Sequence, residues 1–534
     1  MPYIQQHIPD NKSVLAFKIS NLHYERVLEE VSVEFIHSID KTKLLDEEYI
    51  KDIFLDLYSK SCDLLKQKIH SVKSADFYKL LILLHDFSIE AYHAKFIKHN
   101  NIRFSSNFTE QDFALSRRIL KFLIEESVNV EMTFIQEPKD KKSFTSKYEE
   151  HLDVLFGYSS LIYQLAELIS ELSMGVKGIL IELKGSKIYP SRTGKLNNAI
   201  DVLTKEVSSK QMRHAIDTSS ISGMMDMKMA VIQCLEIDYD NAGNVIAGIH
   251  EGLPEKDFGL FGWHSLVYSL ETFGYDFESC ELFFRGLTLD KSNKLDLKEI
   301  PLKPKNLNRY FYRPILIWTI NGTEYAIVTK KKYTESIMQL PVDTIPWGKA
   351  PIEWLSKNCF REYVSRKEDA HDKWLDDLVE EGVKKEKLIY DRNVISIRGS
   401  NLSIRLDKMN VGEIDFIVLN AQLNVIFIID CKNLQGRYDM VSYRDDYSKF
   451  TGKKGYNEKL KNKVEWAKSN LNLLSQHFGQ GSVQKDLTNY KVNGLFILNT
   501  PTFYQYMKTE YTLTSIHDFL DIILGKTQSI KVIE

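Results

Sequence analysis

The chain has 534 residues, of which 43% are hydrophobic, 27% charged and 11% aromatic. This length is too great for a single hydrophobic core, so we expect two to four domains of a soluble globular protein. The formal net charge of −3 excludes a strongly basic protein and by itself indicates no polyanionic partner.

The N-terminal segment and the cysteines predict the compartment. The chain begins without a basic segment followed by a long apolar one, and runs such as Leu80–Leu84 are far too short to cross a bilayer. We therefore expect no signal peptide and no membrane partner. The cysteines are odd in number and widely spaced without a CxxC pair, which predicts neither disulfides nor a zinc cluster and favours a cytoplasmic location. They are Cys62, Cys234, Cys280, Cys359 and Cys431.

Residues 1–210 are expected to form a mainly helical domain. Four long segments have apolar residues at three- and four-residue spacing, the pattern of amphipathic helices. These segments are Leu44–Ile69, Ala75–His99, Glu110–Val128 and Glu150–Ser173.

Residues 211–350 are expected to form a mixed domain of strands and helices. Met229–Tyr239 and Val245–Ile249 flank a polar turn and predict one hairpin, and Arg313–Ile320 with Glu324–Thr329 predicts a second. A helix is expected within Phe258–Thr272. Three prolines between 341 and 351 predict the passage into the last domain.

Residues 351–534 predict an α/β domain with a central mixed sheet, because helices and strands alternate. The expected helices are Trp354–Glu381, Tyr456–Phe478 and Ser515–Leu524, and the expected strands outside the central hairpin are Ile389–Ile397, Leu402–Leu406 and Val492–Leu498. The chain as a whole is thus predicted to be an α+β multidomain protein.

The most informative segment is Gly412–Lys432, which predicts a β-hairpin with charged residues at its open end. If Asn420 pairs with Val425, Asp415 lies opposite Asp430 on the same face, and Lys432 shares that face. A one-residue shift in register would separate the two acids. Charges at the end of an apolar hairpin indicate a functional site, although a strand that simply reaches solvent would give the same pattern.

The residues of this hairpin resemble the PD-(D/E)xK nuclease superfamily, which has the restriction-endonuclease-like fold. The amino-acid sequence around the motif is most similar to the Mrr-like and NERD-like branches of that superfamily. The resemblance covers roughly residues 354–500. It implies that Asp415 is the first acid, Asp430 the second and Lys432 the lysine. It further implies an acid on the first helix, for which Glu368 fits best and Glu362 is the alternative. The usual proline before the first acid is replaced by Ile414.

The implied activity is metal-dependent hydrolysis of phosphodiester bonds. Mg²⁺ or Mn²⁺ would be held by Asp415, Asp430, the backbone carbonyl of Cys431 and Glu368, since these cations prefer oxygen ligands. Lys432 would orient the attacking water or stabilise the developing charge. Glu413 could assist the metal or be a solvated turn residue.

A basic run follows the motif between residues 449 and 468. Its members Lys453, Lys454, Lys459 and Lys463 are candidates for contacts with nucleic-acid phosphates, and the alternative is a solvated helix face. The resemblance implies DNA in preference to RNA as the substrate.

Chains of this build resemble bacterial restriction or antiphage defence effectors, which implies that the N-terminal region senses a trigger, of protein or phage origin, or binds a partner. Cutting both strands of a duplex would suit a homodimer or a larger assembly. The alternative hypothesis is a catalytically silent nucleic-acid-binding or scaffold subunit of a defence complex.

Overall fold

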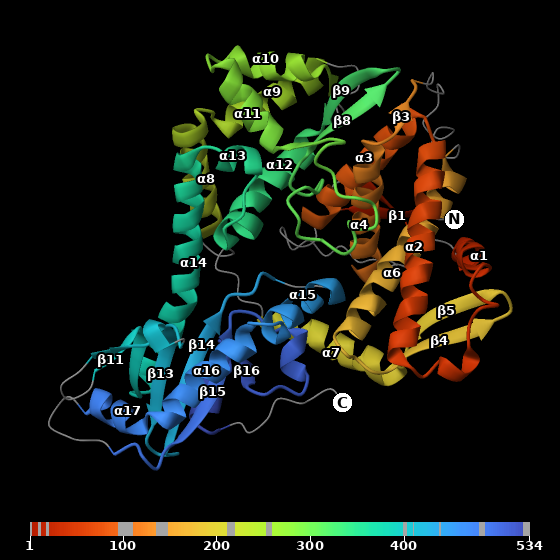
Figure 1. The fold of residues 1–534 in the computed structure, drawn as a ribbon. Coiled ribbons are helices and arrows are strands. Elements are labelled where there is room, and N and C mark those ends of the chain that lie inside the picture. The colour runs from red at the N-terminus through yellow and green to blue at the C-terminus, as the bar shows by residue number, and fades with distance from the viewer. Residues whose placement is uncertain are drawn as a thin grey trace. The chain divides into compact units, whose positions relative to one another are not determined.

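The computed structural model describes residues 3–8, 12–17, 21–93, 110–134, 148–210, 219–252, 259–398, 403–409, 411–436, 439–479 and 486–526 (Figure 1). The chain divides into two compact units. Unit 1 comprises residues 1–172, 179–192 and 218–366, and unit 2 comprises residues 173–178, 193–217 and 367–534. Residues 1–350, predicted as two domains, therefore contribute to unit 1 with two short segments in unit 2.

Unit 1 is mostly helical. Its helices are α1 (Asn21–Ser32), α2 (Glu47–Ser71), α3 (Ala75–Tyr92), α4 (Glu110–Ser127), α6 (Glu149–Ser173, with Ser173 in unit 2), α8 (Ser219–Leu235), α9 (Tyr239–Gly252), α10 (Trp263–Glu271), α11 (Phe277–Gly286), α12 (Lys330–Gln339) and α13 (Ile352–Leu355). Local chemistry sets their ends: Asp46 caps α2 by accepting hydrogen bonds from the backbone N–H groups of Glu48 and Tyr49. The helices predicted for residues 1–210 thus have their counterparts in α2, α3, α4 and α6.

The main sheet of unit 1 joins β3 (Glu131–Met132), β8 (Ile315–Ile320), β9 (Thr323–Val328) and β6 (Gly259–Phe261) in that order, and β7 (Thr288–Leu289) also pairs with β8. The predicted β8–β9 hairpin is confirmed. Its turn, Asn321-Gly322, has positive φ at both residues, which the sequence Asn-Gly accommodates readily. Two further two-stranded sheets are β1 (Tyr3–Ile8) with β2 (Lys12–Phe17) and β4 (Ile179–Lys184) with β5 (Lys187–Arg192).

The hairpin predicted between Met229 and Ile249 is wrong, because both halves are helical, in α8 and α9. Asp238 accepts a hydrogen bond from the backbone N–H of Asp240, so the polar residues read as a hairpin turn instead begin a helix. Val231 and Leu235 of α8 and Val245 and Ile246 of α9 lie in the hydrophobic core of unit 1. Other apolar residues of α8, Met225, Met229 and Ile232, are exposed, so its sequence lacks the polar face that would reveal a helical period.

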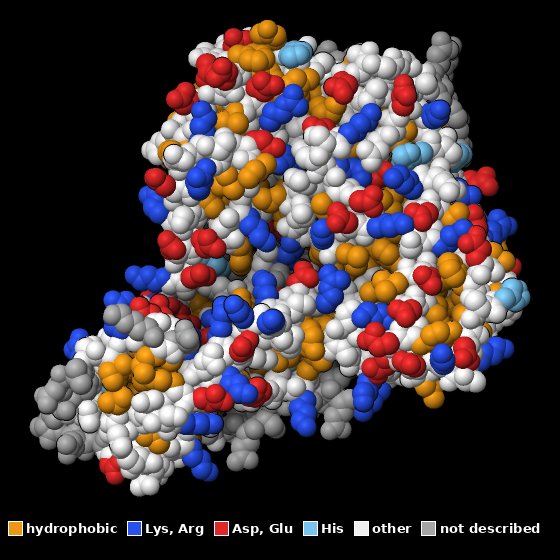
Figure 2. All heavy atoms as spheres, viewed as in Figure 1, with side chains coloured by type: hydrophobic (Ala, Val, Ile, Leu, Met, Phe, Trp, Pro, Cys, Tyr) orange, Lys and Arg blue, Asp and Glu red, His pale blue; other side chains and the backbone are white. Residues whose placement is uncertain are grey.

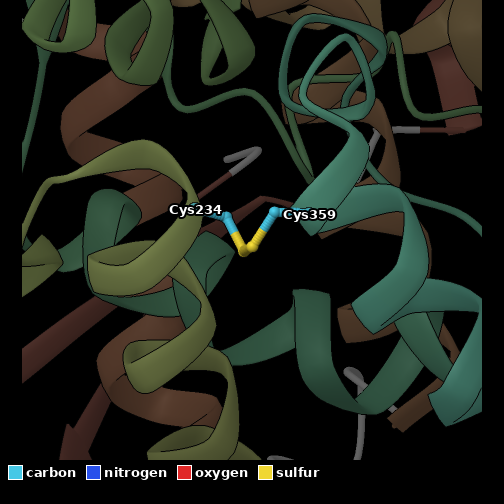
Figure 3. Close-up of a disulfide and its surroundings, with 2 residues drawn as sticks. All are labelled: Cys234 and Cys359. Atoms are coloured by element: carbon cyan, nitrogen blue, oxygen red, sulfur yellow. A yellow bond between two sulfur atoms is a disulfide. The ribbon is translucent and has the colours of Figure 1, made fainter.

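A disulfide joins Cys234 at the end of α8 to Cys359 in the first turn of α14 (Asn358–Lys385), and Figure 3 shows the two side chains meeting. The prediction that the chain has no disulfide is therefore wrong. The two cysteines are 125 residues apart, and only the packing of unit 1 brings them together. The inference of a reducing compartment from cysteine usage loses its basis, although Cys62, Cys280 and Cys431 are free.

Among the described residues one helix, α6, is long and apolar enough to span a membrane, with a mean hydropathy of 1.2 over its most apolar window. In the structure 72% of that window is buried. The apolar side chains of α6 are thus accounted for by packing inside the protein, as in the core helix of a globular domain.

Unit 2 is built around a five-stranded mixed sheet with the order β10 (Ile389–Val394), β13 (Ile414–Asn420), β14 (Val425–Lys432), β15 (Lys491–Leu498) and β16 (Thr512–Ser515). The first three strands are antiparallel neighbours, whereas β15 and β16 continue the sheet in parallel. Beside it, β11 (Ser396–Arg398) and β12 (Ser403–Arg405) form a small hairpin. The predicted α+β class and the central mixed sheet are confirmed, while β16 had not been predicted.

Helices cover both faces of this sheet. On one face, α14 and α18 (Phe519–Ile523) bury their apolar residues against Phe416, Phe427 and Ile429. On the other face, α15 (Met440–Thr451), α16 (Tyr456–Ser469) and α17 (Leu471–Phe478) pack against a second set that includes Ile417 and Ile428. Successive residues of β13 and β14 therefore point alternately into the two hydrophobic cores on either face of the sheet. Because both faces are buried, the sequences of these strands are almost continuously apolar. The remaining helix of unit 2 is α7 (Gly194–Lys210).

Candidate active site

The site lies at the open end of the β13–β14 hairpin. Asn420 pairs with Val425 and Phe416 with Ile429, so one further step in this register sets Asp415 opposite Asp430, as the sequence predicted. The turn fixes the register: the Asn420 side chain accepts hydrogen bonds from the backbone N–H groups of Gln422 and Leu423, and Asn424 adopts a positive φ.

Asp430 is 1% exposed and has an ammonium group at each oxygen. Lys432 lies 3.4 Å from Oδ2, and Lys463 of α16 donates a hydrogen bond to Oδ1. Burial lowers the pKa of Lys432, but the charges of Asp430 and Asp415 outweigh it and raise that pKa above its usual value. Lys432 therefore remains a cation.

Asp415 connects the two strands through its carboxylate. Its Oδ2 accepts a hydrogen bond of 2.7 Å from the backbone N–H of Cys431 and lies 3.8 Å from the Lys432 ammonium. Burial, followed by the nearby charge of Asp430, raises the pKa of Asp415 to about 6 against the opposing effect of the lysines. The carboxylate is thus ionised at neutral pH but holds a proton in mild acid.

Asp376, from α14, is a site residue that the sequence prediction missed. One carboxylate oxygen each from Asp376 and Asp415 and the Cys431 sulfur lie within 4.8 Å of one another. Burial raises the pKa of Asp376, and a hydrogen bond with Cys431 opposes that shift. A signal was present in the sequence, because Asp376 immediately follows Leu375 and precedes Val379 by one turn, and both of these are buried against the sheet.

The helix acid predicted from the family resemblance lies elsewhere. Glu368 is exposed rather than on the inward face of α14, and the alternative, Glu362, is exposed as well. Glu368 precedes Asp376 by eight residues, a distance of about 12 Å along a helix axis. Glu413, just before β13, is also exposed. Asp376 is the α14 acid that the structure brings beside Asp415 and Cys431.

The predicted phosphate-binding lysines divide into two kinds. Lys453 and Lys454, in the loop between α15 and α16, and Lys459 in α16 are exposed. Lys463 is only 7% exposed, and its bond to Asp430 makes it part of the acidic site rather than of the surface. In the structure Lys463 therefore does not present a surface contact for phosphate. On the visible face of the molecule, basic and acidic side chains are intermixed (Figure 2).

The donor set suits a divalent cation. The oxygens of Asp376 and Asp415 are close enough to share one ion, and carboxylates are the ligands that Mg²⁺ and Mn²⁺ prefer. Burial keeps the pKa of the Cys431 thiol well above its ordinary value, so the sulfur is a poor ligand for a hard cation and the Cys431 carbonyl remains the better candidate. Asp430 could become a third ligand of the cation only through an oxygen that Lys432 or Lys463 contacts in the structure.

Comparisons of the chain with protein-family models, with curated proteins and with solved structures gave no match.

Proposed function

We propose that the protein is a metal-dependent nuclease that hydrolyses phosphodiester bonds, with DNA as its substrate. The observation that carries the proposal is the convergence of Asp415, Asp430 and Lys432 at the end of one hairpin. The order of elements in unit 2, with a helix before the antiparallel strands and α16 before β15, supports a restriction-endonuclease-like arrangement.

Each residue has a role in this chemistry. Asp376 and Asp415 would hold a divalent cation, and Asp430 would join them. When bound, the cation would lower the pKa of a water molecule and polarise the phosphate. Lys432 stays positively charged beside both acids, so its ammonium is suited to orienting the attacking water or to stabilising the charge that develops on the phosphate.

Exposed lysines in α16 and in the loop before it would provide a basic surface for binding the substrate. Lys453, Lys454 and Lys459 are exposed, and their charges would neutralise backbone phosphates on either side of the scissile bond. We further infer a bacterial restriction or antiphage defence effector, in which unit 1 binds a trigger or a partner and the whole works as a homodimer or larger assembly. This last step depends on analogy with proteins of similar build.

A second candidate function is a catalytically silent nucleic-acid-binding or scaffold subunit. One observation favours it: both oxygens of Asp430 face ammonium groups, an arrangement that would also suit a purely structural ion pair. The two candidates differ in a direct measurement of cleavage.

The test is incubation of plasmid DNA with the full-length protein and Mg²⁺ or Mn²⁺, with and without EDTA. We expect cleavage only when metal is present. Lys432→Met should reduce the cleavage rate by about 100-fold or more, since a group that stabilises transition-state charge is lost. Lys373→Met, which removes one exposed lysine from α14, serves as the matched control. Equal rates for Lys432→Met and the control would contradict the nuclease, and absence of cleavage by all proteins would favour the silent subunit.

A further inference from the structure

Lys463 is the least expected residue of the site. It lies on the inward face of α16, which it shares with Leu460, Val464 and Ala467. All three of these residues are buried in the core of unit 2. An ammonium group is costly to bury without a partner, so its position depends on the carboxylate of Asp430.

The contacts of Asp430 set up a competition. Its Oδ1 accepts the hydrogen bond from Lys463, while Lys432 faces Oδ2. A divalent cation that used Oδ1 would come within a few ångströms of the Lys463 ammonium, and two positive charges at that range repel strongly in a partly buried site. Cation and Lys463 therefore cannot both be held closely by the same oxygen.

We propose that Lys463 occupies Asp430 in place of the divalent cation, and that its release from Asp430 completes the metal site and frees an ammonium for the scissile phosphate. This inference rests on the proposed nuclease function. Before release, Asp430 is neutralised from within the chain, and Asp376 with Asp415 forms an incomplete site. After release, the cation gains a third carboxylate.

The charges at the site suit a bound phosphate once the cation is present. Asp376, Asp415 and Asp430 have local counter-ions in Lys432, Lys463 and Arg392, of which Arg392 lies 3.8 Å from Asp376. A divalent cation adds two positive charges at the acids, and a phosphodiester group brings a negative charge toward them. An ammonium group released from Asp430 would add to this attraction for the phosphate.

The test is a titration of Mn²⁺ into the full-length protein without nucleic acid, followed by calorimetry or by the EPR signal of free Mn²⁺. Lys463→Met should bind Mn²⁺ at least about tenfold more tightly than the wild type, because a charge at this range changes the binding of a proton by about 10- to 1,000-fold. Lys461→Met is the matched control, since Lys461 lies on the same helix but is exposed and 3.9 Å from Glu510. The control should bind Mn²⁺ like the wild type.

A second variant keeps the test decisive if Lys463→Met does not fold. Lys463→Arg retains the charge and offers a two-pronged contact to Asp430, so it should bind Mn²⁺ more weakly than the wild type. Mn²⁺ affinities of folded Lys463→Met and Lys463→Arg that equal the wild-type value would overturn the inference.

Cleavage measured on the same preparations separates the two proposals. Tighter Mn²⁺ binding together with slower cleavage by Lys463→Met would support both the competition and the role at the phosphate. Tighter binding without cleavage by any protein would leave the competition intact and remove the nuclease. Metal-dependent cleavage by the wild type with unchanged Mn²⁺ affinity in the variants would support the nuclease and rule out the competition between Lys463 and the cation.

Discussion

At the scale of single residues, the structure adds one candidate ligand that the sequence analysis did not identify, the α14 carboxylate of Asp376. Asp376 shares a cluster with Asp415 and Cys431, whereas Glu368 is exposed two turns earlier. We expect Asp376→Asn to weaken Mn²⁺ binding by about 10- to 100-fold, the usual cost of disturbing a metal site. Glu368→Gln should leave the affinity unchanged. The opposite ranking of the two variants in a Mn²⁺ titration would restore Glu368 as the helix ligand.

The residues of the hairpin could be predicted because their information is local. Two apolar runs, an Asn-rich turn and the alternation of side chains fixed the register that places Asp415 and Asp430 together. Lys463 could not be recognised in this way. It belongs to a run of lysines whose other members are exposed, and only the packing of α16 against the sheet turns it inward.

At the scale of elements, the loop between α15 and α16 presents Lys453 and Lys454 to solvent. If both lysines contact phosphates, Lys453→Glu with Lys454→Glu should weaken DNA binding and reduce the slope of log affinity against log salt by about one per lysine. Binding measured by fluorescence anisotropy from 50 to 300 mM salt, about the range where such contacts are lost, would check this. Lys373→Glu with Lys385→Glu is the control, and an equal effect in the control would mean that only net charge matters.

A contact between α3 and the start of α12 gives a pH-dependent stability. Asp86 is 2% exposed and accepts a hydrogen bond of 2.9 Å from Thr329. Burial raises the pKa of Asp86 to about 7, against the Thr329 hydrogen bond and the charges of Lys331 and Lys332, while Glu335 reinforces the shift. The folded state therefore prefers the protonated acid. This stabilisation is fully present below about pH 4 and is lost as pH rises through 7.

Asp86→Asn should remove that dependence, because an amide keeps the acceptor without a charge. At pH 8 the variant should exceed the wild type in free energy of unfolding by on the order of 2–4 kcal/mol, and the difference should shrink toward pH 4. Urea unfolding of both proteins at pH 5 and pH 8 provides the measurement. A difference that stays constant with pH would show that Asp86 does not titrate in this range.

The prediction of a hairpin at α8 and α9 failed for a physical reason. A strand between two helical layers and an apolar helix can both lack a clear period, and α8 carries Met225, Met229 and Ile232 on an exposed surface where a helix usually has polar residues. In α9, the Asn and Gly residues that normally mark turns lie within the helix itself. Tertiary contacts decide whether such a segment becomes a helix or a strand, and local sequence patterns do not reveal those contacts.

At the scale of the whole molecule, the disulfide between Cys234 and Cys359 closes a loop of 125 residues within unit 1. A cross-link of this span stabilises mainly by restricting the unfolded chain, by about 2–5 kcal/mol. We expect dithiothreitol to lower the urea midpoint of unit 1 in the wild type. Cys359→Ser should show the lower midpoint with or without the reductant, and a wild type insensitive to reduction would contradict a stabilising disulfide.

The chain path of unit 2 has a consequence for biosynthesis. Helix α7, with buried Leu203 and with the charge of Glu206 acting on Tyr506, belongs to a unit whose sheet is encoded far downstream. About 200 residues separate α7 from β13, so a ribosome working at a usual speed needs about 10–40 s to supply the partner. During that interval the sheet of its own unit has not been synthesised, and the nascent polypeptide is expected to be a client of chaperones until that sheet has been translated.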